Sequence, residues 1–485
     1  MCGIVGIAST TSVNQQVYDA LGLLQHRGQD STGIATLDGP YVHIRKGRGM
    51  VKEAYRTRDM RALLGHMGLG HVRYATSGEA KNELEAQPFY VNAPYGIVLV
   101  HNGNLTNTRE LERELSTRDM RHTNTGSDTE MLLNVLGSEL QQLVGSAGLD
   151  AEQVFTAVAR THERIRGSYA VIALIAGYGM LAFRDPHGIR PLVLGRREGA
   201  KGRTEWMVAS ESVALTASGY ELVRDVEPGE ALLIGLDGEL QARQTHANPT
   251  LVPCSFEYVY LARPDSIMNG INVYESRLRL GERLADTIAK HTPSGAIDVI
   301  MPIPDSARPA AMEVARKLGI EYREGYYKNR YVGRTFIMPG QARRQKSVRE
   351  KLNALASEFK GKNVLVVDDS IVRGTTSREI VQMTREVGAN SVTFTSAAPP
   401  VRYPHVYGIN MPSRSELIGA GRSIPEINTE LGSDFLVYQE VEDMVGAITE
   451  GSSVRRLDAS CFTGDYVTGD VDAEYLAWVE ATQLS

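Results

Sequence analysis

The sequence predicts a chain of two domains, the second of which is an α/β domain with a central parallel sheet. Its 485 residues exceed what a single hydrophobic core usually supports. After Pro253, short apolar segments alternate with amphipathic helical segments, the pattern of parallel strands covered by helices. The content of 42% hydrophobic and 23% charged residues is ordinary for a globular protein and excludes a disordered or fibrous class.

The net charge and the hydropathy of the chain limit the classes of partner that it can bind. A formal net charge of -6 gives no general attraction for nucleic acid. The longest apolar run, Tyr169 to Ile175, is far shorter than the roughly 20 residues that cross a bilayer, and no signal peptide is recognisable at the start. We therefore expect a cytoplasmic protein that binds neither nucleic acid nor membrane.

The first half opens with MCGIVGI, which places Cys2 at the amino terminus once Met1 is removed. A terminal cysteine carries a thiol and an α-amine in one residue, and the amine can act as general base for the thiol. The alternative interpretation is that Cys2 simply begins an edge strand.

Polar residues interrupt the apolar segments of the first half in three places. Asn102 and Gly103 break an apolar strand and offer an amide and a backbone N–H to an oxyanion, although Asn-Gly is also a hairpin signal. Arg73 follows a short strand, where its guanidinium suits a carboxylate or a surface ion pair. Asp128 suits a substrate ammonium, but it or Ser127 equally suits the N-cap of the following helix.

Six motifs in order resemble the N-terminal-nucleophile glutaminase domain of glutamine amidotransferases: MCGIVGI, LLQHRGQDSTG, GHVRYATSG, HNGNL, NTGSDTE and RDPHGIRPL. The resemblance covers about the first 235 residues and implies an α+β fold, an αββα sandwich. It implies that Cys2 is the nucleophile and that Asn102 and Gly103 form the oxyanion hole. Arg73 and Asp128 would then bind the α-carboxylate and α-ammonium of glutamine, which is hydrolysed to glutamate and ammonia.

Two βα units are predicted in the second half. A covering helix is expected from Val273 to Lys290, and a strand ending at Met301 leads through a loop with Ser306 to a helix closed by Gly319. A second buried strand, 364–367, is followed by a polar loop, a helix and another strand, which is a βαβ crossover.

The loop after this second strand carries the chemistry expected at the carboxyl end of a parallel sheet. Adjacent Asp368 and Asp369 suit Mg²⁺-associated groups or ribose hydroxyls, and a Gly, Thr and Ser loop at a helix N-terminus suits a phosphate. Helix capping with solvated charge is the alternative. The Walker sequence is absent, which excludes a P-loop.

The string VLVVDDSIVRGTTS is similar to the substrate signature of type I phosphoribosyltransferases, which bind phosphoribosyl pyrophosphate (PRPP). This similarity implies that ribose and phosphate are bound by Asp368, Asp369, Ser370, Arg373, Gly374, Thr375, Thr376 and Ser377. It also implies a catalytic loop that closes over the substrate and contributes Lys328, Arg330 and Arg334. A solvated helix face is the alternative for these basic residues.

Together the two halves resemble the amidophosphoribosyltransferase family over about residues 1 to 470. The resemblance implies that ammonia displaces pyrophosphate at C1 of PRPP, giving 5-phosphoribosylamine, the first committed step of purine synthesis. It further implies a single Mg²⁺ ion per subunit at Ser306, Asp368 and Asp369, a homotetramer, and purine nucleotides as feedback inhibitors. An ammonia channel along Tyr258 and Tyr260 is implied as well, with plain strand packing of these alternating tyrosines as the alternative.

One branch of this family carries an iron–sulfur cluster and a propeptide, and here the sequence departs from that branch. Of the cluster ligands only Cys254 and Cys461 are cysteines, while His405 and Asp458 occupy the other positions. Such a set is poor for iron and sulfide, so we expect no cluster. We also expect no propeptide, because Cys2 directly follows Met1.

The expected organisation is a glutaminase domain over 2–235, a phosphoribosyltransferase domain over 250–470 and a helical tail over 471–485. Two other functions are consistent with part of these motifs. One is a glutamine amidotransferase with another acceptor, such as glucosamine-phosphate synthase, asparagine synthetase or glutamate synthase. The other is a PRPP-sensing regulator, which would need a basic helix-turn-helix.

Overall fold

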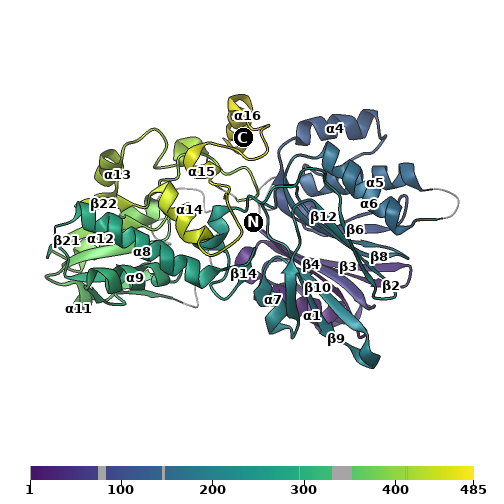
Figure 1. Cartoon of the computed structure of the whole chain (residues 1–485), viewed down its shortest axis with the longest axis horizontal. Coiled ribbons are helices and arrows are strands. Elements are labelled where there is room, and N and C mark those ends of the chain that lie inside the picture. The colour runs from purple at the N-terminus through teal and green to yellow at the C-terminus, as the bar shows by residue number, and fades with distance from the viewer. Residues whose placement is uncertain are drawn as a thin grey trace.

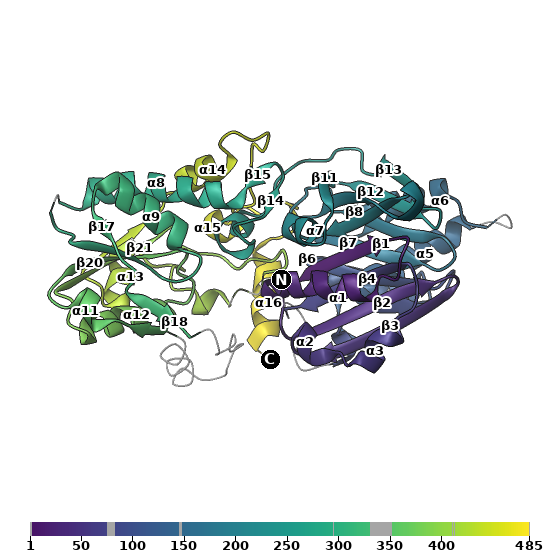
Figure 2. The same ribbon diagram turned by 90° about the horizontal axis from the view of Figure 1, so that it is seen from below.

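The structure is a computed structural model that describes residues 2–74, 83–144, 148–293, 295–329, 352–409, 411 and 413–484. It has two lobes, one formed by the first half of the chain and one by the second, as Figures 1 and 2 show. In the described part of the chain, no helix combines the length and the apolar character needed to cross a membrane.

Two antiparallel sheets form the centre of the first lobe. The seven-stranded sheet has the order β11-β9-β10-β1-β4-β2-β3, and the six-stranded sheet has the order β13-β12-β8-β7-β6-β5. The strands of the first sheet are β1 (Gly3–Ala8), β2 (Ser31–Asp38), β3 (Tyr41–Arg48), β4 (Met67–Arg73), β9 (Val193–Glu198), β10 (Thr204–Ala209) and β11 (Glu221–Asp225). Those of the second are β5 (Phe89–Val91), β6 (Ile97–Leu105), β7 (Gly167–Ile175), β8 (Gly179–Arg184), β12 (Glu230–Gly235) and β13 (Leu240–Gln244).

Helices cover both outer faces of this pair of sheets. They are α1 (Asn14–Leu23), α2 (Val51–Ala54), α3 (Thr57–Arg61), α4 (Thr108–Thr117), α5 (Asp128–Leu143), α6 (Ala151–Arg164) and α7 (Ser212–Ala217). One apolar cluster joins α1 and α7 to the first sheet, a second joins the two sheets, and a third joins α5 and α6 to the second sheet. Three clusters between four layers confirm the αββα sandwich.

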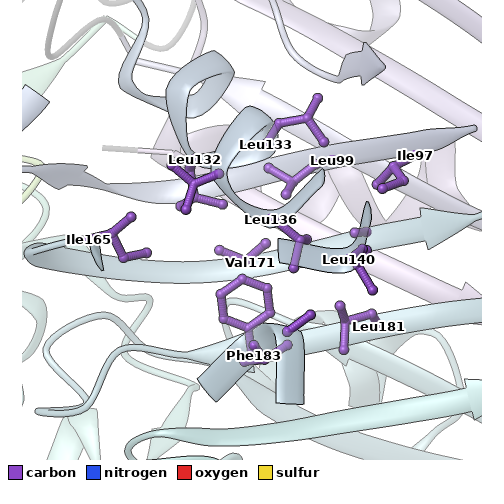
Figure 3. Close-up of a cluster of buried hydrophobic side chains, with 14 of the residues drawn as sticks. Ile97, Leu99, Leu132, Leu133, Leu136, Leu140, Ile165, Val171, Leu181 and Phe183 are labelled. Atoms are coloured by element: carbon purple, nitrogen blue, oxygen red, sulfur yellow. The ribbon is translucent and has the colours of Figure 1, made fainter. Parts of the chain in front are cut away.

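The third cluster shows why α5 is buried over most of its length. Figure 3 shows its leucines meeting apolar side chains of β6, β7 and β8. Its other side packs against α6, so apolar residues surround the helix instead of forming one stripe. This packing fixes Asp128, the first residue of α5, at the end of the sheet.

The second lobe contains a five-stranded sheet of order β17-β16-β20-β21-β22, in which all neighbours pair in parallel. This finding confirms the predicted α/β domain. The strands of this lobe are β14 (Ile267–Met268), β15 (Ile271–Asn272), β16 (Val299–Pro302), β17 (Glu321–Tyr322), β18 (Tyr326–Lys328), β19 (Leu352–Ala354), β20 (Asn363–Asp368), β21 (Ser391–Ser396) and β22 (Phe435–Tyr438). Its described helices are α8 (Val273–His291), α9 (Arg308–Leu318), α11 (Ala356–Phe359), α12 (Thr375–Glu386), α13 (Ile424–Leu431), α14 (Val441–Thr449), α15 (Ser460–Thr463) and α16 (Ala473–Leu484).

Two local sequence signals in the second lobe mark the start of one helix and the end of another, as predicted. The predicted helix from Val273 is α8, and it begins where the Asn272 side chain accepts a hydrogen bond from the Glu275 N–H at 3.2 Å. Helix α9 ends at Gly319, which adopts a left-handed conformation with φ 66°.

Two local predictions are wrong. Strand β6 does not break at Asn102 and Gly103 but continues to Leu105, because β7 pairs with it along its whole length. The segment with Tyr258 and Tyr260 is not a strand but a π-helical turn, Glu257–Leu261. Tyr258 is buried and Tyr260 is exposed, so alternation in the sequence does not correspond to two faces of a sheet.

Buried charges join the two lobes at this turn. Glu257 accepts a hydrogen bond from Arg27 Nη2 at 2.6 Å and also pairs with Arg190. Arg27 pairs in addition with Glu211. Burial alone lowers the pKa of Arg27, but these two carboxylates more than compensate and raise it.

We predict that Glu257→Gln lowers the free energy of unfolding by about 3–5 kcal/mol, because it removes the buried carboxylate that Arg27 and Arg190 share and leaves Arg27 with Glu211 alone. Urea unfolding followed by the fluorescence of Trp206 and Trp478 measures the change. Glu221→Gln is the matched control, since Glu221 forms an exposed 3.4 Å pair with Arg196 and its loss costs at most about 1 kcal/mol. Equal destabilisation by both substitutions would contradict the role of Glu257.

Candidate functional site

Cys2 lies immediately before β1, the strand at the centre of the first sheet. Strands β4 and β10 flank β1, so the position of Cys2 is set from both sides. Its N–H donates to Asn102 Oδ1 at 3.2 Å, and its Sγ lies 3.7 Å from the Tyr74 carbonyl oxygen. Cys2, next to the first sheet, therefore contacts Asn102 of the second sheet, which lies 100 positions later in the chain.

The Asn102 side chain has a free donor beside Cys2. Its Nδ2 is buried and has no hydrogen-bond partner in the described part of the protein. An unpaired buried amide donor is costly, and a substrate oxygen would satisfy it. At Gly103 a Cβ atom would lie 2.0 Å from the Ser168 carbonyl oxygen, so no other residue fits there. Both features suit a site that stabilises an oxyanion.

Arg73 and Asp128 are buried at the ends of β4 and α5, and both already have partners. Arg73 Nη2 donates to Glu85 Oε2 at 2.6 Å. Asp128 Oδ2 accepts from the Leu105 N–H at 3.0 Å, while Ser127, and not Asp128, is at the N-cap position. No sequence motif had singled out Glu85, because its role depends on a contact with Arg73, 12 positions earlier in the chain.

A neutral histidine completes this region. Burial, the largest effect, lowers the pKa of His101, although the neighbouring Asp128 opposes the shift. Its Nδ1 lies 3.2 Å from Thr129 Oγ1 and 3.9 Å from Asp128 Oδ2. The Asp128 carboxylate thus has no imidazolium counter-charge and can attract a substrate ammonium.

The second group of predicted residues gathers at the carboxyl end of β20. Asp368 ends this strand, and Asp369 follows it. Ser370 Oγ donates to Asp369 Oδ1 at 2.6 Å, and Ser306 Oγ donates to Asp369 Oδ2. The loops after β16 and β20 meet here because the two strands are parallel neighbours.

The donor set at this edge suits a hard divalent cation. Asp368, Asp369 and Ser306 offer carboxylate and hydroxyl oxygens, the ligands that Mg²⁺ prefers. Burial, followed by the charge on Asp369, raises the pKa of Asp368 well above its usual range. Burial and the neighbouring carboxylate thus disfavour the charged form of Asp368, and a bound cation would favour it.

A phosphate-type loop lies beside these acids. Gly374 has φ 73° and is the N-cap of α12, which begins at Thr375. A Cβ at Gly374 would lie 2.2 Å from Ile418 Cδ1, so glycine is required both for the turn and for packing. Thr376 is exposed and Ser377 is buried in the first turn of α12. The unpaired N–H groups of this turn suit an anion.

The predicted basic residues are only partly described. Lys328, at the end of β18, is exposed, and its Nζ donates to Asp305 Oδ2 at 3.2 Å. Arg373 Nη2 donates to Glu416 Oε2 at 3.3 Å. Arg330 and Arg334 lie outside the described residues.

Direct contacts connect the first site to the second lobe. Ser168 Oγ, on the strand beside Gly103, donates to the Tyr407 carbonyl at 2.9 Å, and Asn104 Nδ2 donates to the Val406 carbonyl at 2.9 Å. A Cβ on Gly408 would lie 2.8 Å from the carbonyl carbon of Gly103. The backbone of the oxyanion strand therefore packs directly against the second lobe.

Comparisons with known proteins agree with the division of the chain into two lobes with different sites. Residues 71–217 match the family model of the glutamine amidotransferase domain, and residues 272–408 match that of the phosphoribosyl transferase domain. The chain is 54% identical to the amidophosphoribosyltransferase of Pseudomonas aeruginosa, covering 99% of this chain and 95% of the relative. It is 53% identical to that of Escherichia coli, with the same coverage.

A solved structure shows the same arrangement over the whole chain. The glutamine PRPP amidotransferase of B. subtilis, complexed with ADP and GMP, is similar with a TM-score of 0.85 and 36% sequence identity. The similarity covers 97% of this chain and 98% of that one. With these relatives and the geometry of both sites, the chain belongs to the amidophosphoribosyltransferase family.

Proposed function

We propose that this enzyme hydrolyses glutamine at Cys2 and transfers the ammonia to C1 of PRPP at the loop that follows β20. The products are glutamate, pyrophosphate and 5-phosphoribosylamine. The main support is Asn102 beside Cys2, whose Nδ2 has no hydrogen-bond partner among the described residues, in a chain whose other lobe carries paired acids and a phosphate-type loop. The proposed domain bounds remain 2–235 and 250–470, with a tail over 471–485.

The first half of the mechanism follows from the contacts around Cys2. Once Met1 is removed, the N–H that Asn102 Oδ1 now accepts belongs to a terminal amine, which can take the thiol proton. The thiolate attacks the carboxamide carbon of glutamine. Asn102 Nδ2 and the Gly103 N–H stabilise the oxyanion, ammonia leaves, and water hydrolyses the thioester.

Charged residues orient glutamine for this attack. Arg73 would bind its α-carboxylate through its planar guanidinium group, which the hydrogen bond from Nη2 to Glu85 helps to orient. Asp128 would bind its α-ammonium through Oδ1, which accepts only a long hydrogen bond of 3.4 Å from Thr129 Oγ1, whereas Oδ2 accepts from the Leu105 N–H at 3.0 Å.

The second half takes place at the parallel sheet. Asp368 and Asp369 would bind the ribose hydroxyls, and residues 373–377 would bind the 5′-phosphate through the first turn of α12. Lys328, with Arg330 and Arg334, would bind the pyrophosphate as it leaves. Mg²⁺, when bound, would be held by Ser306, Asp368 and Asp369 and would supply positive charge against the pyrophosphate.

We also propose a homotetramer in the cytoplasm that purine nucleotides inhibit and that binds no nucleic acid. The nucleotides ADP and GMP in the B. subtilis relative support this view of regulation. An amidotransferase with another acceptor would lack the loop 368–377, and a PRPP-sensing regulator would not need the site at Cys2.

The coupled reaction predicts that PRPP controls the use of glutamine. Purified enzyme with glutamine and Mg²⁺ should release glutamate and pyrophosphate together when PRPP is present, and little of either without it. Both products are measured in the same samples. If both samples release equal glutamate and neither forms pyrophosphate, PRPP is not the acceptor. The glutaminase activity of the first half would still be supported.

Cys2→Ala should lower glutamine-dependent synthesis by about 10³-fold or more, because the nucleophile is lost. Synthesis from added ammonium should remain near that of the parent, since the second site is intact. The two rates of pyrophosphate release, with glutamine and with ammonium, give the measurement. Unchanged glutamine use would contradict the role of Cys2.

Asp369→Asn should raise the Mg²⁺ concentration for half-maximal synthesis by at least about tenfold, because one anionic oxygen at the cation site is replaced. Synthesis from ammonium, titrated with Mg²⁺, measures this change. Asp434→Asn is the matched control. Asp434 precedes β22 at the opposite end of the parallel sheet, where it pairs with Arg385. A normal Mg²⁺ titration of Asp369→Asn would exclude Asp369 from the cation site.

A further inference from the structure

A buried cluster of Cys254, His405 and Asp458 lies outside both proposed sites. Cys254 Sγ is 3.3 Å from His405 Nε2, and the same nitrogen is 3.3 Å from Asp458 Oδ2. The three ligand atoms all lie within 4.8 Å of one another, and all three residues are buried. Cys461 is buried in the same apolar cluster of the second lobe as Cys254.

The backbone sets the positions of these side chains. Cys254 and Asp458 form a parallel β-bridge. The Asp458 N–H donates to the Pro253 carbonyl at 2.9 Å, and the Ser255 N–H donates to the Asp458 carbonyl at 3.0 Å. Ser460, beside Cys461, donates its N–H to Asp458 Oδ1 at 3.1 Å. The ligand atoms are thus held together by three separate segments of the chain.

The geometry does not suit a nucleophile. Both contacts of His405 with its neighbours in the cluster use Nε2, so the ring cannot pass a proton from Cys254 to Asp458 through its two nitrogens.

One atom of the cluster lacks a hydrogen bond. Asp458 Oδ2 is buried and has no hydrogen-bond partner among the described residues; its approach to His405 has an ion-pair distance without hydrogen-bond alignment. A buried carboxylate oxygen in this condition is costly. A cation between the thiol, the imidazole and the carboxylate would satisfy it.

We propose that Cys254, His405 and Asp458 bind a zinc ion, and that Cys461, whose sulfur does not lie within 4.8 Å of all three of these ligand atoms, turns toward the ion as the fourth ligand. Sulfur, nitrogen and carboxylate oxygen are the donors that Zn²⁺ takes, and bond lengths of about 2.0–2.3 Å place tetrahedral ligand atoms roughly 3.3–3.7 Å apart. The separations of His405 Nε2 from Cys254 Sγ and from Asp458 Oδ2, both 3.3 Å, lie at the lower end of that range. Four protein ligands in a buried place make the zinc structural.

An iron–sulfur cluster does not suit the same residues. Such clusters are held by four cysteine thiolates, or by cysteine with histidine, and here a carboxylate occupies one position. Thiolate, imidazole and carboxylate together are typical of a single zinc ion.

Binding must displace protons. His405 Nδ1 accepts the Tyr407 N–H at 3.2 Å, which places the ring proton on Nε2 in the metal-free protein. When zinc bonds to Nε2, this proton moves to Nδ1 and the contact with the Tyr407 N–H opens. The protons of Cys254 and Cys461 pass to solvent as their sulfurs bond to zinc. One weak contact is lost, whereas four coordination bonds form.

The full chain, produced with zinc in the medium and freed of loosely bound metal by gel filtration, should contain about one zinc per chain by elemental analysis. Cys254→Ser and Asp458→Asn should each lower this content by at least about tenfold. Cys2→Ser, which removes a thiol outside the cluster, is the matched control and should keep the zinc.

A second measurement needs no variant. Parent protein produced with cobalt in place of zinc should show sulfur-to-metal charge transfer and intense visible bands of tetrahedral Co²⁺. The proposal is overturned if the folded parent contains neither metal near stoichiometry, if it contains iron and acid-labile sulfide, or if the cluster variants fold and keep their zinc. If a variant fails to fold, the cobalt spectrum of the parent decides.

Discussion

The bridge that Glu257 forms between Arg27 and Arg190 is the interaction on which the relation between the two lobes depends. All three side chains are buried, so their charges have no access to solvent and must compensate one another. Such a network tolerates little displacement, because moving any member leaves an unpaired buried charge. The segment after Pro253 that carries Glu257 forms a helical turn.

Rigid packing at this interface serves the chemistry of the first lobe. Gly103 supplies a backbone N–H to the proposed oxyanion hole, and the same residue lies against Gly408 of the second lobe. Two glycines allow the backbones to approach more closely than any side chain would. A shift of the second lobe would therefore reach the glutamine site through the backbone itself, without an intermediate side chain.

The two cation sites that we propose differ as their functions require. Ser306 and Asp369 lie at the open end of a parallel sheet and offer oxygen atoms, which suits Mg²⁺ that arrives and leaves with a phosphorylated substrate. Cys254, His405 and Asp458 are closed within an apolar cluster, which suits an ion that holds three chain segments together. Neither set of ligands can replace the other.

The sequence by itself determined the two chemistries, because the nucleophile of the first and most of the substrate loop of the second stand in short, recognisable motifs. Cys2 follows Met1, and the paired acids and the phosphate-type loop lie within 368–377. The parallel sheet was also predictable, since buried strands and amphipathic helices have different periods. Even so, local preference failed where long-range contacts decide, as in the unbroken strand β6 and the helical turn at Glu257.

Only the tertiary structure decided which distant residues meet. Asn102 reaches Cys2, Ser306 reaches Asp369, and His405 reaches Cys254 across 100, 63 and 151 positions respectively. No local pattern encodes these contacts, because each depends on how whole sheets and loops pack. The physical reason is that strand periodicity fixes the direction of a side chain relative to its own sheet, whereas its neighbours are fixed by the packing of one element on another.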